Sequence, residues 1–386
     1  GFEVIDEREA DQIAEIFDNG GVLFRQGFDA LRNGVFKVRE FEEAFASYMG
    51  VPSALAVTSG TAALRVALAV LKIQPLEEII IPSFTFVATA EAVIEAGGVP
   101  VCVDIDETLN MDPDALLNAI GPRTRAVIAV HMLGTPARLM EIQKICSRAG
   151  LPMIEDTAWG CGGSLNDRKM GTWGEMGAFS FDFAKTMTTG EGGMLVSQDE
   201  DIGLAARAWH DHGHENNPLV QRWEDTRSSS GFNFRMTELQ GAVGLAQLTK
   251  LDDVINGQRA SHEVLRLAVE SADGVVVRSS PEGSTPTYDA FVFQVPSSEY
   301  ARKCRDELVK EGIGTKILPE ALTWHFAAYW SHMPALVAQH GEGLRHAFTG
   351  SESHLSRSVA LPTSAIGKGP RPEKVREIID RVIGNR

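Results

Sequence analysis

The stretch EEIIIPSFTFVATAEAVIEAGGVPVCVDID (residues 77–106) decides the fold class of this chain. It begins and ends with apolar, β-branched runs, 77–84 and 99–106, which have the length and composition of buried strands. Between them, residues 86–97 carry apolar side chains at the spacing of a helix. A strand, a crossover helix and a second strand form the unit from which parallel sheets are built.

The same alternation continues on both sides of this stretch. Helix-period segments occupy 61–73 and 138–150, and Asp112-Pro113 is typical of a helix start, with Asp as N-cap and Pro in the first turn. Further buried strands are expected at 124–133, 151–158 and 192–199. The sequence therefore predicts an α/β domain with a mostly parallel sheet, and such sheets carry their chemistry in the loops at the carboxyl ends of the strands.

The predicted pattern of helices and strands changes after this alternation. Residues 236–272 read as one long helix or a broken pair of helices. Beyond Gly274 two short strands, a helix and a terminal helix (372–386) are expected, which indicates a smaller α+β domain. We therefore divide the chain into a large α/β domain, 1–260, which includes an N-terminal segment, and a small domain, 261–386.

Composition limits the possible partners. The 386 residues include 36 Lys+Arg against 52 Asp+Glu, a net charge of −16, so binding to a nucleic-acid backbone or an anionic membrane surface is not expected. No segment has the length of a membrane span, and the first residues lack the pattern of a signal peptide, although a leader removed before Gly1 is compatible with the sequence. Four cysteines without a CxxC pair favour free thiols in a reducing cytoplasm.

Three local motifs carry candidate chemistry. Ser59-Gly60-Thr61 follows an apolar run and opens a helix, where backbone N–H groups bind a phosphate or carboxylate; a plainly capped helix is the alternative. Asp156, at the end of a predicted strand, is placed to meet a ligand cation or a protonated ring nitrogen, or else to cap the next turn. Lys185 leaves an alternating apolar stretch just before a glycine-rich loop, where desolvation makes a lysine nucleophilic; a solvated surface charge is the alternative.

Other motifs carry less weight. The HDHGH run (210–214) lacks the spacing of structural zinc sites, and no metal is expected. The glycines around Cys161 lack the third glycine of a dinucleotide fingerprint, which argues against a nicotinamide dehydrogenase. A nucleophile elbow of the GxSxG type is also absent from the sequence, which disfavours a serine hydrolase.

Five segments taken together resemble a known family. They are SGTAAL (59–64), IPSFTFVATAEAVIEAGGVPVCVDID (81–106), MIEDTAWGCGGS (153–164), GAFSFDFAKTMTTGEGGM (177–194) and GFNFRMTELQGAVGLAQL (231–248). In this order they resemble the sugar aminotransferases of the DegT/DnrJ/EryC1/StrS family, which depend on pyridoxal 5'-phosphate and have the aspartate-aminotransferase-like fold (fold type I). The similarity runs from about residue 20 to residue 364.

The resemblance implies roles for the matching positions. Lys185 would be the Schiff-base lysine, and Asp156 would pair with the pyridinium nitrogen of the cofactor. The remaining cofactor contacts would come from Gly60, Thr61 and Ser180 on the phosphate, Phe86 on the ring face, and Asn233 on the phosphate of the partner subunit. The resemblance thus implies a homodimer with shared active sites. Trp159 departs from the family, which commonly has His or Gln there, so the contact of this residue with the cofactor stays open.

Three further segments, 24–42, 209–215 and 323–330, look closer to the branch of the family that makes 8-amino-3,8-dideoxy-octulosonate, an amino sugar acid of lipopolysaccharide. Residues 25–39 hold four basic side chains, among them Arg25 and Arg32, against one acidic residue, so they are candidates for binding an acidic acceptor; ion pairing at a subunit contact is the alternative. His325 lies in the region from which the small domain of the family contacts substrate.

These inferences predict a homodimeric, cytoplasmic aminotransferase that moves an amino group from glutamate to a keto or aldehyde carbon of a sugar. An 8-oxo-octulosonate-type sugar acid is the first acceptor considered, and a nucleotide-linked keto sugar is the second. The alternatives are a cofactor-dependent sugar dehydratase of the same fold, in which histidine replaces the lysine found here at position 185, and a non-catalytic pyridoxal-phosphate-binding regulator.

Overall fold

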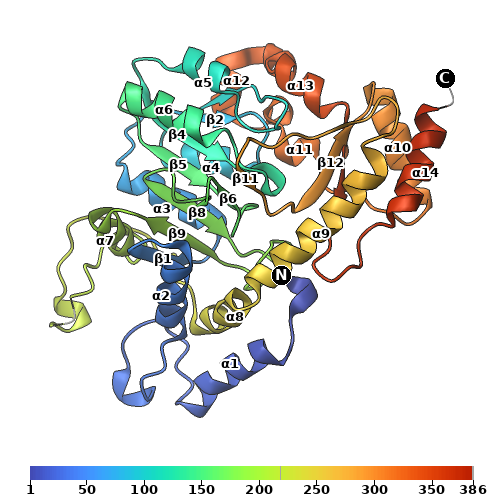
Figure 1. Cartoon of the computed structure of the whole chain (residues 1–386). Helices are drawn as coiled ribbons and strands as arrows, with labels where there is room; N and C mark the ends of the chain where they lie inside the picture. The colour runs from blue at the N-terminus through green and yellow to red at the C-terminus, as the bar shows by residue number, and fades with distance from the viewer. Residues whose placement is uncertain (218, 385–386) are drawn as a thin grey trace.

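A seven-stranded sheet forms the centre of the molecule in the computed structural model, which describes residues 1–217 and 219–384. Its strand order is β1-β9-β8-β5-β4-β2-β3 (Figure 1). The strands are β1 (Ser53–Val57), β2 (Glu78–Pro82), β3 (Val99–Val103), β4 (Thr124–Val130), β5 (Met153–Asp156), β8 (Met176–Ser180) and β9 (Gly193–Ser197). Among the described residues, β9 runs antiparallel to β1 and β8, and the other neighbouring strands pair in parallel.

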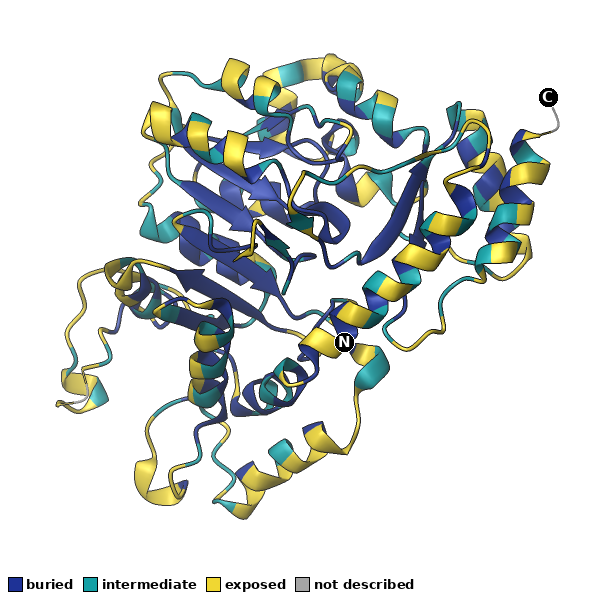
Figure 2. Cartoon of the chain, viewed as in Figure 1, coloured by how far each residue is buried: buried dark blue, intermediate teal, exposed yellow. Residues whose placement is uncertain are grey.

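Helices cover both faces of this sheet, as the parallel strands require. Successive side chains of a strand point to opposite faces, and β4 shows this: Ala126 and Ile128 pack with α3 (Gly60–Val70) and α4 (Ala88–Glu95), whereas Val127 packs on the side of α6. The strands are accordingly buried along their length (Figure 2). The other helices around the sheet are α1 (Glu7–Asp18), α2 (Lys37–Met49), α5 (Pro113–Ala119), α6 (Leu139–Ala149), α7 (Glu200–Trp209) and α8 (Glu238–Leu248).

A smaller antiparallel sheet lies at the other end of the long helix α9 (Leu251–Val269), with strand order β10-β12-β13. The apolar residues on one face of this sheet, such as Phe291 and Leu361, share a core with the end of α9 and with two helices, whereas Val292 and Ala360 belong to the core of the large sheet. These elements are β10 (Val276–Val277), β12 (Ala290–Gln294), β13 (Ser358–Pro362), α10 (Ser298–Lys310) and α14 (Pro372–Ile383). A third small sheet joins β6 (Ser164–Leu165) and β7 (Arg168–Lys169) to β11 (Ser284–Thr285).

One part of the C-terminal sequence packs against the large sheet rather than the small one. Residues of 318–355, Trp330 among them, belong to the same apolar core as α3 and α4. The helices of this part are α11 (Leu322–His325), α12 (Pro334–His340) and α13 (Thr349–Leu355). Short 3-10 helices complete the chain: η1 (Phe2–Val4), η2 (Asp29–Leu31), η3 (Met132–Gly134), η4 (Arg222–Glu224), η5 (Ala327–Tyr329) and η6 (Gly341–His346).

The predicted fold class, α/β with a mostly parallel sheet and a smaller α+β part, is confirmed. Asp112 caps α5 by accepting a hydrogen bond from the backbone N–H of Asp114, and residues 236–272 form the broken pair α8 and α9. The predicted terminal helix ends at Ile383, and its residues 385 and 386 lie outside the described part of the chain. The division at residue 260 stays a prediction.

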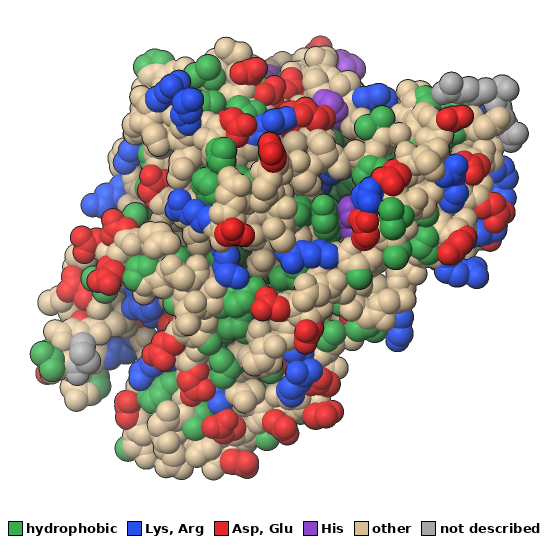
Figure 3. Space-filling model, viewed as in Figure 1, with side chains coloured by type: hydrophobic (Ala, Val, Ile, Leu, Met, Phe, Trp, Pro, Cys, Tyr) green, Lys and Arg blue, Asp and Glu red, His purple; other side chains and the backbone are tan. Residues whose placement is uncertain are grey.

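The surface carries charges of both signs, and acidic side chains are frequent around α1 (Figure 3). Within residues 1–217 and 219–384, none of the helices combines the length and the apolar composition that a membrane span requires.

Candidate active site

The carboxyl ends of β1, β5 and β8 bring three of the predicted site residues to one edge of the sheet. Gly60 follows β1, Asp156 ends β5, and Ser180 ends β8. Gly60 touches Ser180 so closely that a Cβ atom on Gly60 would lie 2.7 Å from Cβ of Ser180. Only glycine fits here, because this distance is shorter than a van der Waals contact between carbon atoms.

The start of α3 at this edge is built to hold an anion. The Ser59 hydroxyl caps the helix by accepting a hydrogen bond from Ala62 N at 3.0 Å, while Ser59 O accepts one from Ala63 N. The N–H groups of Gly60 and Thr61, in the first turn, have no acceptor within the helix. Thr61 is exposed and the Ser180 hydroxyl lies beside Gly60, so these groups form a cradle of the size and polarity of a phosphate.

Asp156 is a buried carboxylate in this edge. Its Oδ2 accepts a hydrogen bond from the Thr89 hydroxyl at 2.9 Å, and its Oδ1 accepts one from Ala158 N at 3.2 Å. Burial raises the pKa of Asp156, which the hydrogen bond from Thr89 opposes. Glu155 points to the other face of the sheet and is held by backbone N–H groups there, so the two adjacent carboxylates have different roles.

Lys185 lies against an aromatic ring rather than in water. Its Nζ is 3.1 Å from the centre of the Trp159 ring, and Trp159 is 9% exposed. Burial lowers the pKa of Lys185 to about 8, with an opposing effect from Asp289 and a further lowering by Lys316. A desolvated amine with a pKa this close to neutrality is the form that attacks a carbonyl carbon.

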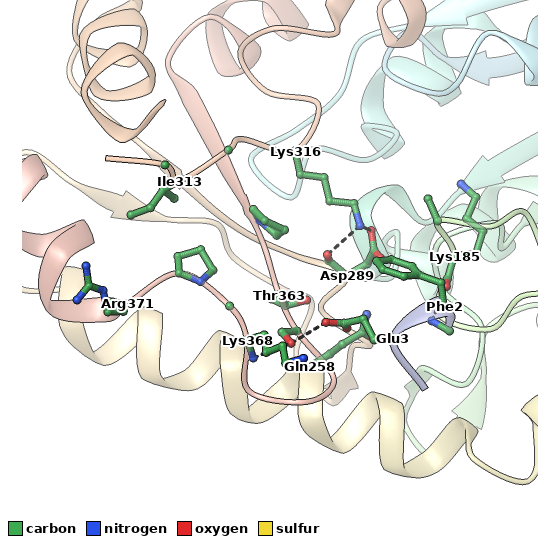
Figure 4. Close-up of a pocket in the computed structure, with 18 of the residues that line it drawn as sticks. Phe2, Glu3, Lys185, Gln258, Asp289, Ile313, Lys316, Thr363, Lys368 and Arg371 are labelled. Atoms are coloured by element: carbon green, nitrogen blue, oxygen red, sulfur yellow. Dashed lines mark hydrogen bonds and ion pairs between the residues drawn. The ribbon is translucent and has the colours of Figure 1, made fainter. Parts of the chain in front are cut away.

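A cavity of about 430 Å³ opens beside Lys185, between the end of β8 and the small sheet (Figure 4). Lys316 and Asp289 face it from the small sheet, and their Nζ and Oδ2 atoms are 2.6 Å apart. Phe2 and Glu3 line it from the N-terminal segment, and Lys368 and Arg371 lie toward its outer wall.

Aromatic side chains form another wall near Lys185. The His325 ring lies 5.4 Å from the Phe86 ring and 6.5 Å from the Trp159 ring, and Phe86 also stacks on Trp324 at 6.3 Å. Backbone hydrogen bonds fix this arrangement, since Thr85 N donates to His325 O and Val87 N donates to Trp324 O. The structure therefore brings His325 and Phe86 to the site from segments that are distant in sequence.

Asn233 is exposed, near the start of α3. The next residue, Phe234, accepts a hydrogen bond from Thr58 N at 3.0 Å, which ties this segment to the end of β1. The Asn233 side chain accepts only a long hydrogen bond from Arg235 N, at 3.4 Å, within the described residues. A contact between Asn233 and the partner subunit's cofactor stays a prediction.

The structure does not bring Arg25 and Arg32 to the cavity at Lys185. Both are buried: Arg25 pairs with Glu42 at 2.8 Å, and Arg32 lies 3.3 Å from Glu238 and donates to the carbonyls of Val35 and Gly27. Arg25, Arg32 and Lys37 of this basic segment form ion pairs inside the chain, and a substrate contact of Arg25 or Arg32 stays a prediction.

Three site residues escaped the sequence analysis: Thr89, Asp289 and Lys316. Thr89 lies in the first turn of α4, and its N–H donates to Phe86 O at 3.0 Å, so its closeness to the predicted Phe86 provides a signal. Asp289 directly precedes a strand and Lys316 lies in a loop, and no local pattern distinguishes either from a surface charge.

This arrangement fits pyridoxal phosphate. The cradle of Gly60, Thr61 and Ser180 matches its phosphate, the buried carboxylate of Asp156 matches its protonated ring nitrogen, and Lys185 matches its aldehyde carbon.

Comparisons with known proteins agree with this fit. Residues 26–383 match the model of the DegT/DnrJ/EryC1/StrS aminotransferase family. GDP-perosamine synthase of Caulobacter vibrioides is 40% identical over 220 residues, 55% of this chain and just over half (57%) of that enzyme. Spore coat polysaccharide biosynthesis protein SpsC of Bacillus subtilis is 32% identical over 84% of each chain.

Solved structures extend the similarity to the whole fold. The structure of 3-amino-5-hydroxybenzoic acid synthase matches with a TM-score of 0.84 at 28% identity, over 99% of this chain and 97% of that one. DesV of S. venezuelae matches with a TM-score of 0.83 at 27% identity, over 100% and 96%. Together with the site, these matches establish that the chain belongs to the DegT/DnrJ/EryC1/StrS aminotransferase family and is a pyridoxal-phosphate-dependent transaminase.

Proposed function

We propose that the enzyme transfers an amino group from glutamate to a keto or aldehyde carbon of a sugar. The observation that carries this proposal is the position of Lys185, whose Nζ rests 3.1 Å from the Trp159 ring centre, beside the phosphate cradle and the buried Asp156. The proposal agrees with the names of relatives that make amino sugars, such as GDP-perosamine synthase and a dTDP-sugar 4-aminotransferase.

The residues of the chain divide the work. When bound, pyridoxal phosphate supplies the electron sink that stabilises negative charge next to the amino nitrogen. Asp156 would hold the proton on its ring nitrogen, and the cradle at Gly60 would fix its phosphate. Lys185 Nζ, once displaced by the donor, would take the proton from the donor's Cα as general base and return it as general acid. Donor and acceptor would use the same site in turn, which predicts ping-pong kinetics.

The proposal also concerns which sugar accepts the amino group. The free sugar acid rests on the resemblance of residues 24–42, 209–215 and 323–330 to the octulosonate branch and on the basic segment around Arg25. In that segment, Arg25 and Arg32 pair with Glu42 and Glu238. The names of the relatives favour a nucleotide-linked keto sugar. We therefore rank the nucleotide-linked sugar first and an octulosonate-type sugar acid of lipopolysaccharide biosynthesis second.

We also propose a homodimer with shared active sites and a cytoplasmic location. The exposed Asn233 beside the α3 cradle supports the first, because its amide lies at the surface where a partner's cofactor would be reached. The four cysteines, free and buried, support the second. Mixing Lys185→Ala protein with Asn233→Ala protein tests sharing: heterodimers regain one working site, and inactive mixtures with proven subunit exchange would contradict it.

Two alternatives are less well supported. A sugar dehydratase of this fold has histidine in place of the lysine, and Lys185 therefore argues against that reaction. A non-catalytic regulator is not favoured, because the relatives named above are biosynthetic enzymes.

The decisive experiment offers the holoenzyme glutamate and then a panel of oxidised sugars, both nucleotide-linked and free. Glutamate alone should convert the cofactor to its amine form, and the true acceptor should restore the aldehyde form, read by absorbance. A wild-type enzyme that does not react with glutamate would refute glutamate as the donor. An enzyme that restores the aldehyde form only with 2-oxo acids would refute the sugar acceptor.

A further inference from the structure

We infer that Lys316 is the residue that binds the α-carboxylate of the amino donor. The inference rests on the proposed function, because it assumes that the donor nitrogen takes the place of Lys185 Nζ. Nothing in the sequence motifs points to Lys316, and it acts here as a specificity residue for the first half-reaction.

The ammonium groups of Lys185 and Lys316 lie over the same aromatic ring. Lys185 Nζ is 3.1 Å and Lys316 Nζ is 5.4 Å from the centre of the same Trp159 ring, so the two nitrogens are no farther apart than these distances added together. An α-amino acid carries its carboxylate on the carbon that bears its nitrogen. Both ammonium groups lie over the same ring, so the carboxylate of a donor whose nitrogen replaces Lys185 Nζ would lie on the side of the ring that Lys316 faces.

The Lys316 ammonium group has more hydrogen-bond donors than Asp289 takes up. An ammonium group has three N–H donors. The Asp289 carboxylate takes one at 2.6 Å, and Asp289 O is 3.2 Å from the same Nζ. Lys316 lines the cavity that Lys185 also lines, and its side chain is 21% exposed (Figure 4). One donor is therefore left for a ligand, while Asp289 keeps the cation neutralised when no ligand is bound.

Backbone and side-chain hydrogen bonds hold Lys316 and Asp289 in place, as a binding site requires. Thr287, two residues before Asp289, donates through its N–H to Gly134 O and through its hydroxyl to Trp159 O. Lys316 N donates to Ala360 O of β13 at 2.8 Å. These bonds fix the Lys316–Asp289 pair relative to Trp159, and hence relative to Lys185.

The positions of the cations around the cavity indicate which carboxylate of glutamate binds Lys316. Lys316 lies over the ring that carries Lys185, next to the reacting nitrogen, whereas Lys368 and Arg371 lie on the outer wall of the cavity. The carboxylate adjacent to the nitrogen reaches Lys316, and the distal carboxylate of glutamate points outward. The carboxylate of an octulosonate aminated at its far end would not reach Lys316, which makes the residue selective for an amino acid donor.

The test compares glutamate with two amides in the first half-reaction of the holoenzyme. Isoglutamine lacks the α-carboxylate, and glutamine lacks the distal one. In the wild type, we expect half-saturation with isoglutamine to need about 10- to 100-fold more donor than with glutamate, since a charge-assisted hydrogen bond is lost. In Lys316→Met this difference should collapse, whereas the difference between glutamate and glutamine should remain.

Binding of 2-oxoglutarate, measured by calorimetry, gives a readout that does not require turnover. Lys316→Met should weaken it by about 10- to 100-fold, and Lys316→Arg, which keeps the charge, should recover part of the loss. The control is Lys303→Met, an exposed lysine on α10 that does not line the cavity, for which we expect a change of less than about threefold.

The outcomes separate this inference from the proposed function. A wild type that does not react with glutamate refutes the donor in the proposed function. A wild type that reacts, together with a Lys316→Met variant that still prefers glutamate to isoglutamine by the same factor, overturns the role of Lys316. An equal loss in Lys303→Met also overturns it, because the effect would then be a general charge effect.

Discussion

Two buried charge clusters of this enzyme look alike in composition but differ in their use. The Lys185 cluster comprises Lys185, Lys316 and Asp289, which line the cavity of about 430 Å³, and the buried Asp156, whose charge acts on Lys185. The Arg25 cluster comprises Arg25, Glu42, Arg207 and His210, behind β1. Each contains cations and carboxylates that are largely removed from water.

In the Arg25 cluster almost every donor has a partner. The two oxygens of Glu42 are 2.8 Å and 3.1 Å from the guanidinium groups of Arg25 and Arg207, and each arginine also donates to a strand carbonyl. His210 Nε2 lies 3.0 Å from Arg25, and burial, followed by the charge of Arg25, lowers the pKa of His210 to about 3. The neutral imidazole therefore accepts from Arg25 at neutral pH.

In the Lys185 cluster the reactive lysine has no carboxylate at hydrogen-bonding distance of its Nζ among the described residues. Lys185 Nζ rests on the Trp159 ring instead, and Lys316 keeps a spare donor beside the cavity. The comparison teaches that burial of charge does not identify a functional site. Unused hydrogen-bonding capacity next to a cavity does, because a ligand can take it up without breaking the fold.

The largest expected effect is that of Lys185→Ala, which should lower turnover by at least about 10⁴-fold because the residue is both attachment point and general base. Borohydride reduction of the wild-type holoenzyme should place the cofactor on Lys185, as read by peptide mass spectrometry. Lys169→Ala is the matched control, since Lys169 also rests on an aromatic ring, 3.6 Å from the centre of Tyr48, but away from the cavity. A label on Lys169 would show that Lys185 is not the attachment point of the cofactor.

Asp156→Asn should lower turnover by about 10²- to 10³-fold, because a neutral amide cannot hold the ring proton by charge. Cofactor binding should persist through the phosphate cradle, and equilibrium dialysis of pyridoxal phosphate measures it. Thr89→Val, which removes the 2.9 Å hydrogen bond to Asp156 together with the 2.7 Å hydrogen bond between the Thr89 and Thr85 hydroxyls, should cost about tenfold. Near-native turnover of Asp156→Asn would assign Asp156 a structural role like that of Glu155.

Arg25→Met should act on stability rather than on catalysis. Removing one partner of a buried pair leaves Glu42 undercompensated, and we expect a loss of about 3 kcal/mol in the free energy of unfolding, measured with urea. The ratio of KM values for acidic and neutral acceptors should not change. Arg8→Met, at an exposed pair with Asp6, should leave the midpoint unchanged. A stable Arg25→Met protein with an altered acceptor preference would show that Arg25 acts in substrate binding.

The smallest expected effect is on the pH dependence of Lys185. Its neutral form reacts, so acetylation of Lys185 in the cofactor-free protein should reach half its maximal rate near pH 8. Lys316→Met removes a nearby positive charge that lowers the pKa of Lys185, and the midpoint should move to higher pH. Asp289→Asn removes a negative charge that raises this pKa, and the midpoint should move to lower pH. Shifts in the same direction for both variants would contradict the arrangement.

The sequence by itself determined the fold class and the family. Apolar, β-branched runs and helical segments of period 3.6 are local features, and they predicted β2, β3, β4, β5 and β9 of the sheet. The alternating stretch 179–185 was expected to continue to Lys185, whereas β8 ends at Ser180. The order of the five motifs predicted the family, which the match over residues 26–383 confirms. Gly60, Asp156, Ser180 and Lys185 lie directly at or after strand ends, so their convergence follows from the topology of a parallel sheet.

Only the tertiary structure decided which charges are available to a ligand. The excess of basic residues in 25–39 suggested a substrate site, but the partners of Arg25 and Arg32 are Glu42 and Glu238, one of them some 200 residues away in the chain. Lys316 and Asp289 carry no motif, and they reach Trp159 because the small sheet folds back on the large one. Periodicity records which face of an element is buried; the pairing of charges depends on contacts between distant segments, which only the folded chain creates.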